Sequence, residues 1–199
     1  MSKVQTINIA LIGYGFVGKT FHAPLIQSVD GIKLAVVSSR DEEKVKRDLL
    51  DVEVVATPEE AIQHPDVDLV VIASPNATHA PLATLALNSG KHVVVDKPFT
   101  LDMQEARDLI ALADEKQLLL SVFHNRRWDS DFLGIKQIIE QGTLGKVKHL
   151  ESHIDRFRPE VRVRWREQNV PGSGLWFDLG PHLIDQTLQL FGLPESVQG

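Results

Sequence analysis

The sequence contains no cysteine, and this absence removes several kinds of chemistry. Disulfide bonds, thiolate metal ligands and cysteine nucleophiles are all excluded, and a reducing cytosol is compatible with the composition. Long apolar runs are missing too, since none approaches the ~18 residues that a membrane span needs. The polar N-terminus has no signal-peptide character. We therefore expect a soluble, cytoplasmic protein with no membrane partner.

An excess of positive charge is also missing. The chain has 21 Lys and Arg against 27 Asp and Glu, a net charge of −6. Such a balance works against attraction to nucleic acid, so small-molecule partners are favoured and no nucleic-acid partner is expected. Hydrophobic residues make up 43% of the 199-residue chain. They are enough to form the core of one large domain, or of one domain and part of a second.

Three glycines spaced G-x-G-x-x-G follow the apolar run of residues 8–12. The pattern predicts a strand, a tight turn and a helix: Gly13 permits the turn, and Gly15 lets the backbone approach a pyrophosphate. Gly18 lets the helix pack closely on the strand. The first helical N–H groups, at Phe16 and Val17, then point at the phosphates. A chance glycine-rich turn is the alternative.

Apolar strands and helical stretches alternate along residues 1–123. After the first strand, further strands are expected at 33–38, 52–56, 68–73, 92–95 and 118–123. A capping box at 57–60 and a cap at Thr100 mark helix starts. This alternation predicts an α/β fold, a Rossmann-type doubly wound parallel sheet, with ligands bound outside the carboxyl ends of the strands.

The pattern changes at residue 124. We expect a helix to about Gln141, a long strand over 147–157, a charged loop over 158–174 and a helix from Pro181 to Phe191. One strand and two helices make a poor closed domain, so residues 124–199 are interpreted as the incomplete beginning of an α+β second domain. The exposed edge of that strand should favour self-association or local disorder.

The second strand ends at Ser38, Ser39 and Arg40, about 20 residues after the glycine pattern, where an NAD site usually places a carboxylate. Hydroxyl donors and a guanidinium suit a 2′-phosphate instead. The prediction is NADP, with NAD as second choice. The alternative is that Arg40 pairs with Asp41 or Glu43 in solvent.

Three residues could transfer protons. Lys97 follows a buried strand and lies beside the expected crevice, although it could simply pair with Asp96. Asp178 and His182 are four residues apart, so that the aspartate could orient the imidazole, or each could serve only as a cap or hydrogen-bonding residue.

Other polar residues lie near the same crevice or could bind metal. Asp185 could complete a metal trio with Asp178 and His182, although we predict no metal site. Residues at strand ends could contact a polyol or the nicotinamide ribose, or act as caps; they are Pro75, Asn76, His79, Asn125 and Arg126.

The glycine pattern, the Asp96-Lys97-Pro98 triplet and the 172–182 segment resemble the Gfo/Idh/MocA oxidoreductase family. Residues 124–129, 164–167 and 184–186 are similar to its NADP-dependent scyllo-inositol dehydrogenase branch. Asp96 departs from the family's commoner glutamate, and family members continue for well over a hundred residues, so the chain is interpreted as truncated.

The resemblance implies an enzyme that moves a hydride between nicotinamide and a ring carbon of a cyclic polyol or sugar. It implies proton transfer by Lys97, Asp178 and His182, cofactor contacts at Asn76 and His79, and substrate contacts that include Asn125, Arg126 and Trp165. It also implies a homo-oligomer when full length, while the fragment itself should bind NADPH without efficient turnover. A non-catalytic NADP-binding sensor on the same fold is the alternative.

Overall fold

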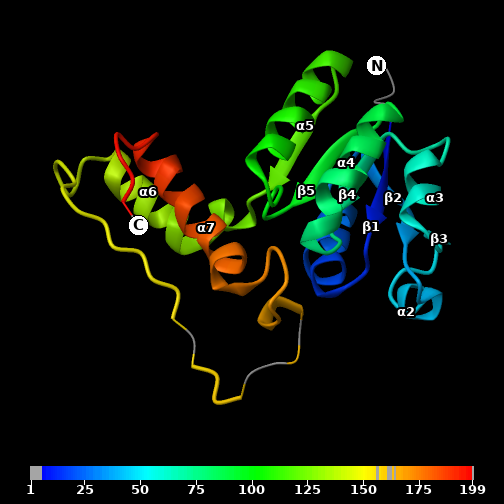
Figure 1. The fold of residues 1–199 in the computed structure, drawn as a ribbon, viewed down its shortest axis with the longest axis horizontal. Helices are drawn as coiled ribbons and strands as arrows, with labels where there is room; N and C mark the ends of the chain where they lie inside the picture. The colour runs from blue at the N-terminus through cyan, green and yellow to red at the C-terminus, as the bar shows by residue number, and fades with distance from the viewer. Residues whose placement is uncertain (1–5, 156, 161–162, 164, 199) are drawn as a thin grey trace. The chain divides into compact units, whose positions relative to one another are not determined.

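A computed structural model describes residues 6–155, 157–160, 163 and 165–198. The chain divides into two compact units, Met1–Phe123 and His124–Gly199, which are described separately (Figure 1).

The first unit is built on a six-stranded sheet in the order β3-β2-β1-β4-β5-β6. Every neighbouring pair is parallel. The strands are β1 Ile7–Ile12, β2 Ile32–Ser38, β3 Glu53–Val55, β4 Leu69–Ile72, β5 His92–Asp96 and β6 Leu120–Phe123. The predicted doubly wound sheet is confirmed.

Helices cover both faces of this sheet, which is why its strands are apolar on both sides. One face carries the π-helical turn η1 Gly18–His22, α1 Ala23–Gln27 and α2 Glu42–Lys46. The other carries α3 Pro58–Gln63, α4 His79–Asn88 and α5 Met103–Lys116. Successive residues of β1 alternate between the two cores, with Leu11 in the first and Ile12 in the second.

The structure confirms one of the two expected helix caps and contradicts the other. The capping box is confirmed, since Thr57 and Glu60 exchange side chain to backbone hydrogen bonds. The cap at Thr100 is wrong. Asp102 immediately precedes α5, and its carboxylate accepts the Gln104 N–H at 2.6 Å, while the Thr100 hydroxyl donates to the Asp102 carbonyl.

The described residues of the second unit form helices joined by turns and irregular segments. It contains η3 Asn125–Trp128, α6 Ser130–Glu140, η4 Trp165–Glu167 and α7 Gly174–Phe191. The expected start of α7 at Pro181 is wrong, because Pro181 lies inside the helix. A proline clashes with the Cβ of the residue before it in a helical backbone, and Gly180 has no Cβ. The helix therefore continues through the proline.

The expected strand over 147–157 is also wrong. Described residues 147–155 adopt no strand, and the side chain of Phe157 is 93% exposed. All strands of the described residues belong to the first unit, so this segment has no strand of its own unit with which to pair. Self-association of the chain stays a prediction.

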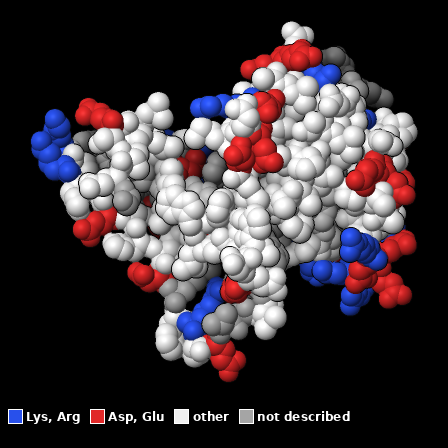
Figure 2. Space-filling model, in the orientation of Figure 1, with Lys and Arg blue, Asp and Glu red and all other residues white. Residues whose placement is uncertain are grey.

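Charges of both signs lie together on the surface shown in Figure 2. Around α2, acidic and basic side chains are interspersed, in keeping with the Glu42, Glu43, Lys44 and Lys46 of that helix. Over the described part of the chain, no helix combines the length and apolar character needed to cross a membrane.

Candidate functional site

The glycine pattern forms a tight loop between β1 and η1. Gly13 has φ +95°, and a Cβ there would lie 2.7 Å from the Ala73 carbonyl oxygen. A Cβ at Gly18 would overlap the carbonyl oxygen of Gly13, so only glycine lets the helix come this close to the loop. A Cβ at Gly15 would meet nothing within 4 Å. The loop therefore has one open face, at Gly15.

The first helical turn begins at this open face. Phe16 and Val17 already have helical backbone, and the Lys19 N–H donates to the Gly15 carbonyl at 3.0 Å. The N–H groups before it belong to a first turn, which has no partners for them within the helix. They are suited to an anion. The Phe16 ring is 74% exposed and meets Phe21 edge to face.

The Tyr14 side chain, within the glycine pattern, connects the glycine loop to Asp48. Its ring is buried, and its hydroxyl donates to the Asp48 carboxylate at 3.2 Å. Burial, together with this carboxylate, raises the pKa of Tyr14 to about 12. Lys19 lies 2.7 Å from the same carboxylate, and its hydrogen bond lowers the pKa of Asp48. Sequence reasoning missed this network because its members are far apart in the chain.

Backbone hydrogen bonds join the glycine loop to the ends of β2 and β4. The Gly13 N–H donates to the Ser38 carbonyl at 3.1 Å, and the Ala73 N–H donates to the Ile12 carbonyl at 2.9 Å. β1 and β4 are neighbours at the point where the strand order reverses, the place where open α/β sheets bind ligands.

The Ser38–Arg40 segment lies at the same end of the sheet, where the carboxyl ends of the strands meet. Ser38 is buried at the end of β2, and the Ser39 hydroxyl accepts the Asp41 N–H. The Asp41 carboxylate caps α2 by accepting the Lys44 N–H at 2.9 Å. Arg40 is exposed, and within the described ranges it forms no ion pair. The alternative pairing of Arg40 with its acidic neighbours is therefore not seen.

The loop after β4 carries the next predicted group. Pro75 precedes η2 Asn76–Thr78, and Asn76 is 6% exposed. His79, the first residue of α4, is 1% exposed, and its ring nitrogens lie within hydrogen-bond distance of two backbone carbonyls. The geometry gives His79 a part in joining loops; its direct contact with a cofactor stays a prediction.

Lys97 directly follows β5, as the sequence predicts. Its N–H donates to Oδ1 of the Asp96 carboxylate at 2.6 Å. The other carboxylate oxygen lies 3.7 Å from Nε2 of His22, and both side chains are buried. The His22 ring packs against Phe123, with ring centres 4.2 Å apart and ring planes tilted by 44°. Sequence reasoning missed His22, whose only signal is a polar residue four positions after the last glycine of the pattern.

Asp178 and His182 both lie in α7, so their spacing of four places them on one helix face. His182 is buried, and the Asp178 carboxylate lies 3.4 Å from Nε of Arg166. Arg166 belongs to the expected charged loop over 158–174, of which residues 161, 162 and 164 lie outside the described residues.

Asp185 lies on the same face one turn later, but its carboxylate is already engaged. Arg127 donates to both oxygens, at 2.8 Å from Nε and 2.6 Å from Nη2. These hydrogen bonds raise the pKa of Arg127. Nδ1 of His124 lies 4.0 Å away. In the part of the chain that the structure describes, no three His, Asp or Glu side chains are arranged to hold a metal ion.

The predicted substrate residues of the second unit lie near α7. Asn125 and Arg126 are in η3, and Arg126 pairs with Asp129 at 2.9 Å. The Arg126 carbonyl accepts from Gln186 of α7 at 3.0 Å. Trp165 is in η4, and its side chain lies outside the described part of the structure. Their contacts with substrate stay predictions.

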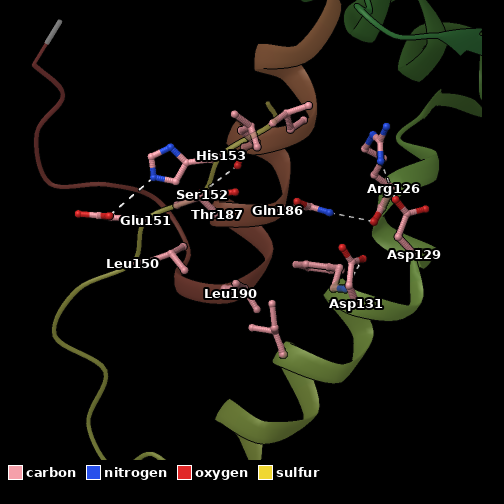
Figure 3. Close-up of a pocket in the computed structure, with 14 residues that line it drawn as sticks. Arg126, Asp129, Asp131, Leu150, Glu151, Ser152, His153, Gln186, Thr187 and Leu190 are labelled. Atoms are coloured by element: carbon pink, nitrogen blue, oxygen red, sulfur yellow. Dashed lines mark hydrogen bonds and ion pairs between the residues drawn. The ribbon is translucent and has the colours of Figure 1, made fainter. Parts of the chain in front are cut away.

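A cavity of about 160 Å³ lies in this unit between α6, residues 150–154 and α7 (Figure 3). Its α7 lining consists of Leu183, Gln186, Thr187 and Leu190. These positions form a different helix face from that of Asp178 and His182. The cavity is therefore separate from the predicted catalytic pair.

The features of the first unit fit a dinucleotide. The glycine loop is open only at Gly15, the first-turn N–H groups follow it, and the loop lies where the strand order reverses. These features define a Rossmann-type dinucleotide-binding domain.

Comparisons with known proteins agree with this domain assignment. Residues 7–124 match the family described as "Oxidoreductase family, NAD-binding Rossmann fold", and residues 132–199 match the GFO/IDH/MocA C-terminal domain. The chain belongs to the Gfo/Idh/MocA oxidoreductase family, as the resemblance predicts.

Individual relatives support the assignment. The chain is 59% identical to the uncharacterized oxidoreductase YdgJ of Escherichia coli, covering 97% of this chain and 56% of YdgJ. It is 44% identical to IolW of Bacillus subtilis, a scyllo-inositol 2-dehydrogenase (NADP⁺), covering 98% and 54%. A crystal structure from Klebsiella pneumoniae is 81% identical with a TM-score of 0.89, covering 97% and 53%. The chain thus spans about half the length of these relatives.

Proposed function

We propose that the whole protein is an NADP(H)-dependent oxidoreductase that transfers a hydride between nicotinamide and a ring carbon of a cyclic polyol or sugar. The observation that carries this proposal is the position of Lys97 at the end of β5, on the sheet edge that holds the glycine loop. The 44% identity to IolW, named an NADP⁺-dependent scyllo-inositol dehydrogenase, supports the inositol-like substrate. So does the 32% identity to the inositol 2-dehydrogenase of Rhodococcus jostii.

The cofactor would be held by the first unit. The N–H groups that follow Gly15 would bind the pyrophosphate, and Arg40 would bind the 2′-phosphate, with Ser38 and Ser39 beside it. When bound, NADP would supply the nicotinamide that accepts or donates the hydride. The residues of the chain must then manage only the proton of the substrate hydroxyl.

Three side chains would transfer the proton. The amine of Lys97 would hold or release a proton at the substrate oxygen. His182 would accept a proton, with Asp178 orienting its ring. Arg166 lies 3.4 Å from Asp178 and would help to hold that carboxylate in place.

A turnover screen of the whole protein tests the proposal. Inositol stereoisomers and aldoses are each assayed with NADP⁺ and NAD⁺, and calorimetry measures NADPH binding to the 199-residue chain. We expect turnover of at least one cyclic polyol or sugar, with higher kcat/KM for NADP⁺. Tight NADPH binding with no turnover of any substrate would favour the alternative, a sensor. A chain that binds neither cofactor would contradict both.

A further inference from the structure

The Asp48 carboxylate contacts one side chain of the glycine loop and one of the helical turn that follows it. It accepts a hydrogen bond from the Tyr14 hydroxyl at 3.2 Å, and the Lys19 ammonium lies 2.7 Å from the same oxygen. Tyr14 is buried, whereas Lys19 and Asp48 are partly exposed. A carboxylate accepts several hydrogen bonds at once, so both donors can be held together.

Asp48 belongs to the segment that also carries Arg40. This segment, residues 39–52, connects β2 to β3 and includes α2. Asp41, next to Arg40, caps α2 through its carboxylate. Hydrogen bonds of the helical turn continue beyond α2, where the Leu49 N–H donates to the Val45 carbonyl at 2.9 Å. Arg40 and Asp48 therefore flank one short hydrogen-bonded unit.

Buried apolar side chains pack this unit beside the glycine loop. Val45 is 0% exposed and Leu49 is 5% exposed, and both belong to the same core cluster as Tyr14. Apolar packing of this kind is not directional. The hydrogen bond from Tyr14 to Asp48 adds direction, because it requires a defined distance and angle. The segment 39–52 is thus fixed to the glycine loop in orientation as well as in distance.

NADPH would bind at the two places that this contact connects. In the proposed function, the pyrophosphate lies at the N–H groups that follow Gly15, and the 2′-phosphate lies at Arg40. Because one molecule must reach both places, their separation decides whether both contacts form at once. NADH has no 2′-phosphate and requires only the first place.

We propose that Asp48 is a positioning residue for cofactor selectivity, which holds Tyr14 and so sets the place of Arg40 relative to the glycine loop. The 2′-phosphate contact of Arg40 rests on the proposed function, whereas the contact between Tyr14 and Asp48 does not. The Lys19 ammonium offsets the negative charge of Asp48, which would otherwise oppose an anionic cofactor.

Two substitutions separate positioning from charge. Tyr14→Phe keeps the buried ring and every charge, and it removes the hydroxyl. We expect NADPH affinity of the 199-residue chain to fall roughly two- to tenfold, the cost of ordering a freed side chain on binding, with NADH affinity nearly unchanged. Asp48→Ala should also weaken NADPH binding, although it removes a negative charge and electrostatics alone would strengthen binding.

Calorimetry with both cofactors measures these affinities. Asp51→Ala is the matched control, since it removes an exposed acid from the same segment and should not weaken NADPH binding. Unchanged or tighter NADPH binding in both Tyr14→Phe and Asp48→Ala would overturn the proposal. Equal losses for NADPH and NADH would overturn it too, because they would show a general effect on the fold.

A double-mutant cycle tests whether the effect acts through Arg40. If it does, Tyr14→Phe should cause no further loss of NADPH affinity in the Arg40→Ala background. Losses that add would reject the positioning of Arg40 by this contact.

NMR tests the contact without any cofactor. Tyr14 is the only tyrosine of the sequence, so a chain labelled with ¹³C at the tyrosine ζ carbon shows one signal. We expect Asp48→Ala to shift this signal and Asp51→Ala to leave it in place. An unshifted signal in Asp48→Ala would overturn the proposal, whether or not the chain binds NADPH. If the signal shifts but Arg40→Ala keeps full NADPH affinity, the proposed 2′-phosphate site fails and the selectivity role fails with it, while the contact stands.

Discussion

Arg127 and Asp185 are joined by two hydrogen bonds across 58 residues of sequence, from the guanidinium to both carboxylate oxygens. Asp185 is 8% exposed, so its charge is largely removed from water and requires this partner. The pair ties η3 to α7. It therefore supports the helix that carries Asp178 and His182.

Removing Arg127 should destabilise the second unit. Arg127→Ala leaves the Asp185 carboxylate buried without its guanidinium, and we expect a loss of about 2 kcal/mol in the free energy of unfolding. The value is at the low end because the Arg127 side chain is 39% exposed. Urea unfolding measures it, with the exposed Arg158→Ala as control. Equal stability of the two variants would contradict the assignment.

The glycine loop offers a matched pair of substitutions. Gly18→Ala places a Cβ against the backbone carbonyl of Gly13, and we expect it to lower the free energy of unfolding by ~1–3 kcal/mol. Gly15→Ala meets open space and should leave stability nearly unchanged while weakening NADPH binding. Thermal unfolding and calorimetry separate the two effects. Loss of stability in both variants, with equal binding, would remove the phosphate-binding role of Gly15.

The capping box predicts an acid-sensitive contribution to stability. Hydrogen bonding to the Thr57 N–H lowers the pKa of Glu60. A carboxyl whose pKa is lower in the folded state stabilises the fold above its ordinary pKa, and this stabilisation is lost as the pH falls through the folded pKa. Wild type should therefore be more stable than Glu60→Gln near neutral pH, and the difference should vanish in acid. Glu59→Gln, in the same turn, is the control. A difference that persists in acid would show another cause.

The parts of the fold that the sequence predicts are those set by local chemistry. Residues 9–12 of β1 are buried on both faces and form a continuous apolar run, and a Cβ at Gly13 or Gly18 of the pattern that follows would meet backbone atoms. The position of Lys97 follows from the end of β5 alone. These features require no knowledge of distant residues.

The parts that the sequence could not predict depend on long-range pairing. Residues 147–155 have strand-like composition, but a strand forms only with a neighbour, and their own unit supplies none among its described residues. His22 meets Asp96 only because the π-helical turn packs against the end of β5. Such contacts appear once the topology is known.

Lys97 is proposed to act in proton transfer rather than in cofactor affinity. In the whole protein, Lys97→Ala should lower kcat by roughly 10²- to 10⁴-fold, with little change in the dissociation constant of NADPH. Lys116→Ala, at the exposed end of α5, is the control for loss of a positive charge. Steady-state kinetics and calorimetry measure the two quantities. Unchanged turnover in Lys97→Ala would exclude the lysine from the reaction and favour the sensor alternative.

Arg40 is the residue on which the cofactor prediction depends. It is exposed beside the end of β2 and, among the described residues, is not held by an ion pair, so its guanidinium is available to a 2′-phosphate. A charge-assisted hydrogen bond of this kind contributes ~1.5–3 kcal/mol, or roughly ten- to hundredfold in affinity. Solvent screening places the expected loss in Arg40→Ala near tenfold for NADPH.

NADH has no 2′-phosphate, so its affinity should hardly change in the same variant. Arg107→Ala, an exposed arginine of α5, removes the same charge away from the crevice and should leave both affinities unchanged. Dissociation constants for both cofactors, measured on all three proteins, decide the matter. If Arg40→Ala loses equal affinity for NADPH and NADH, Arg40 does not bind the 2′-phosphate. If the wild-type protein binds NADH more tightly than NADPH, its cofactor is NAD rather than NADP.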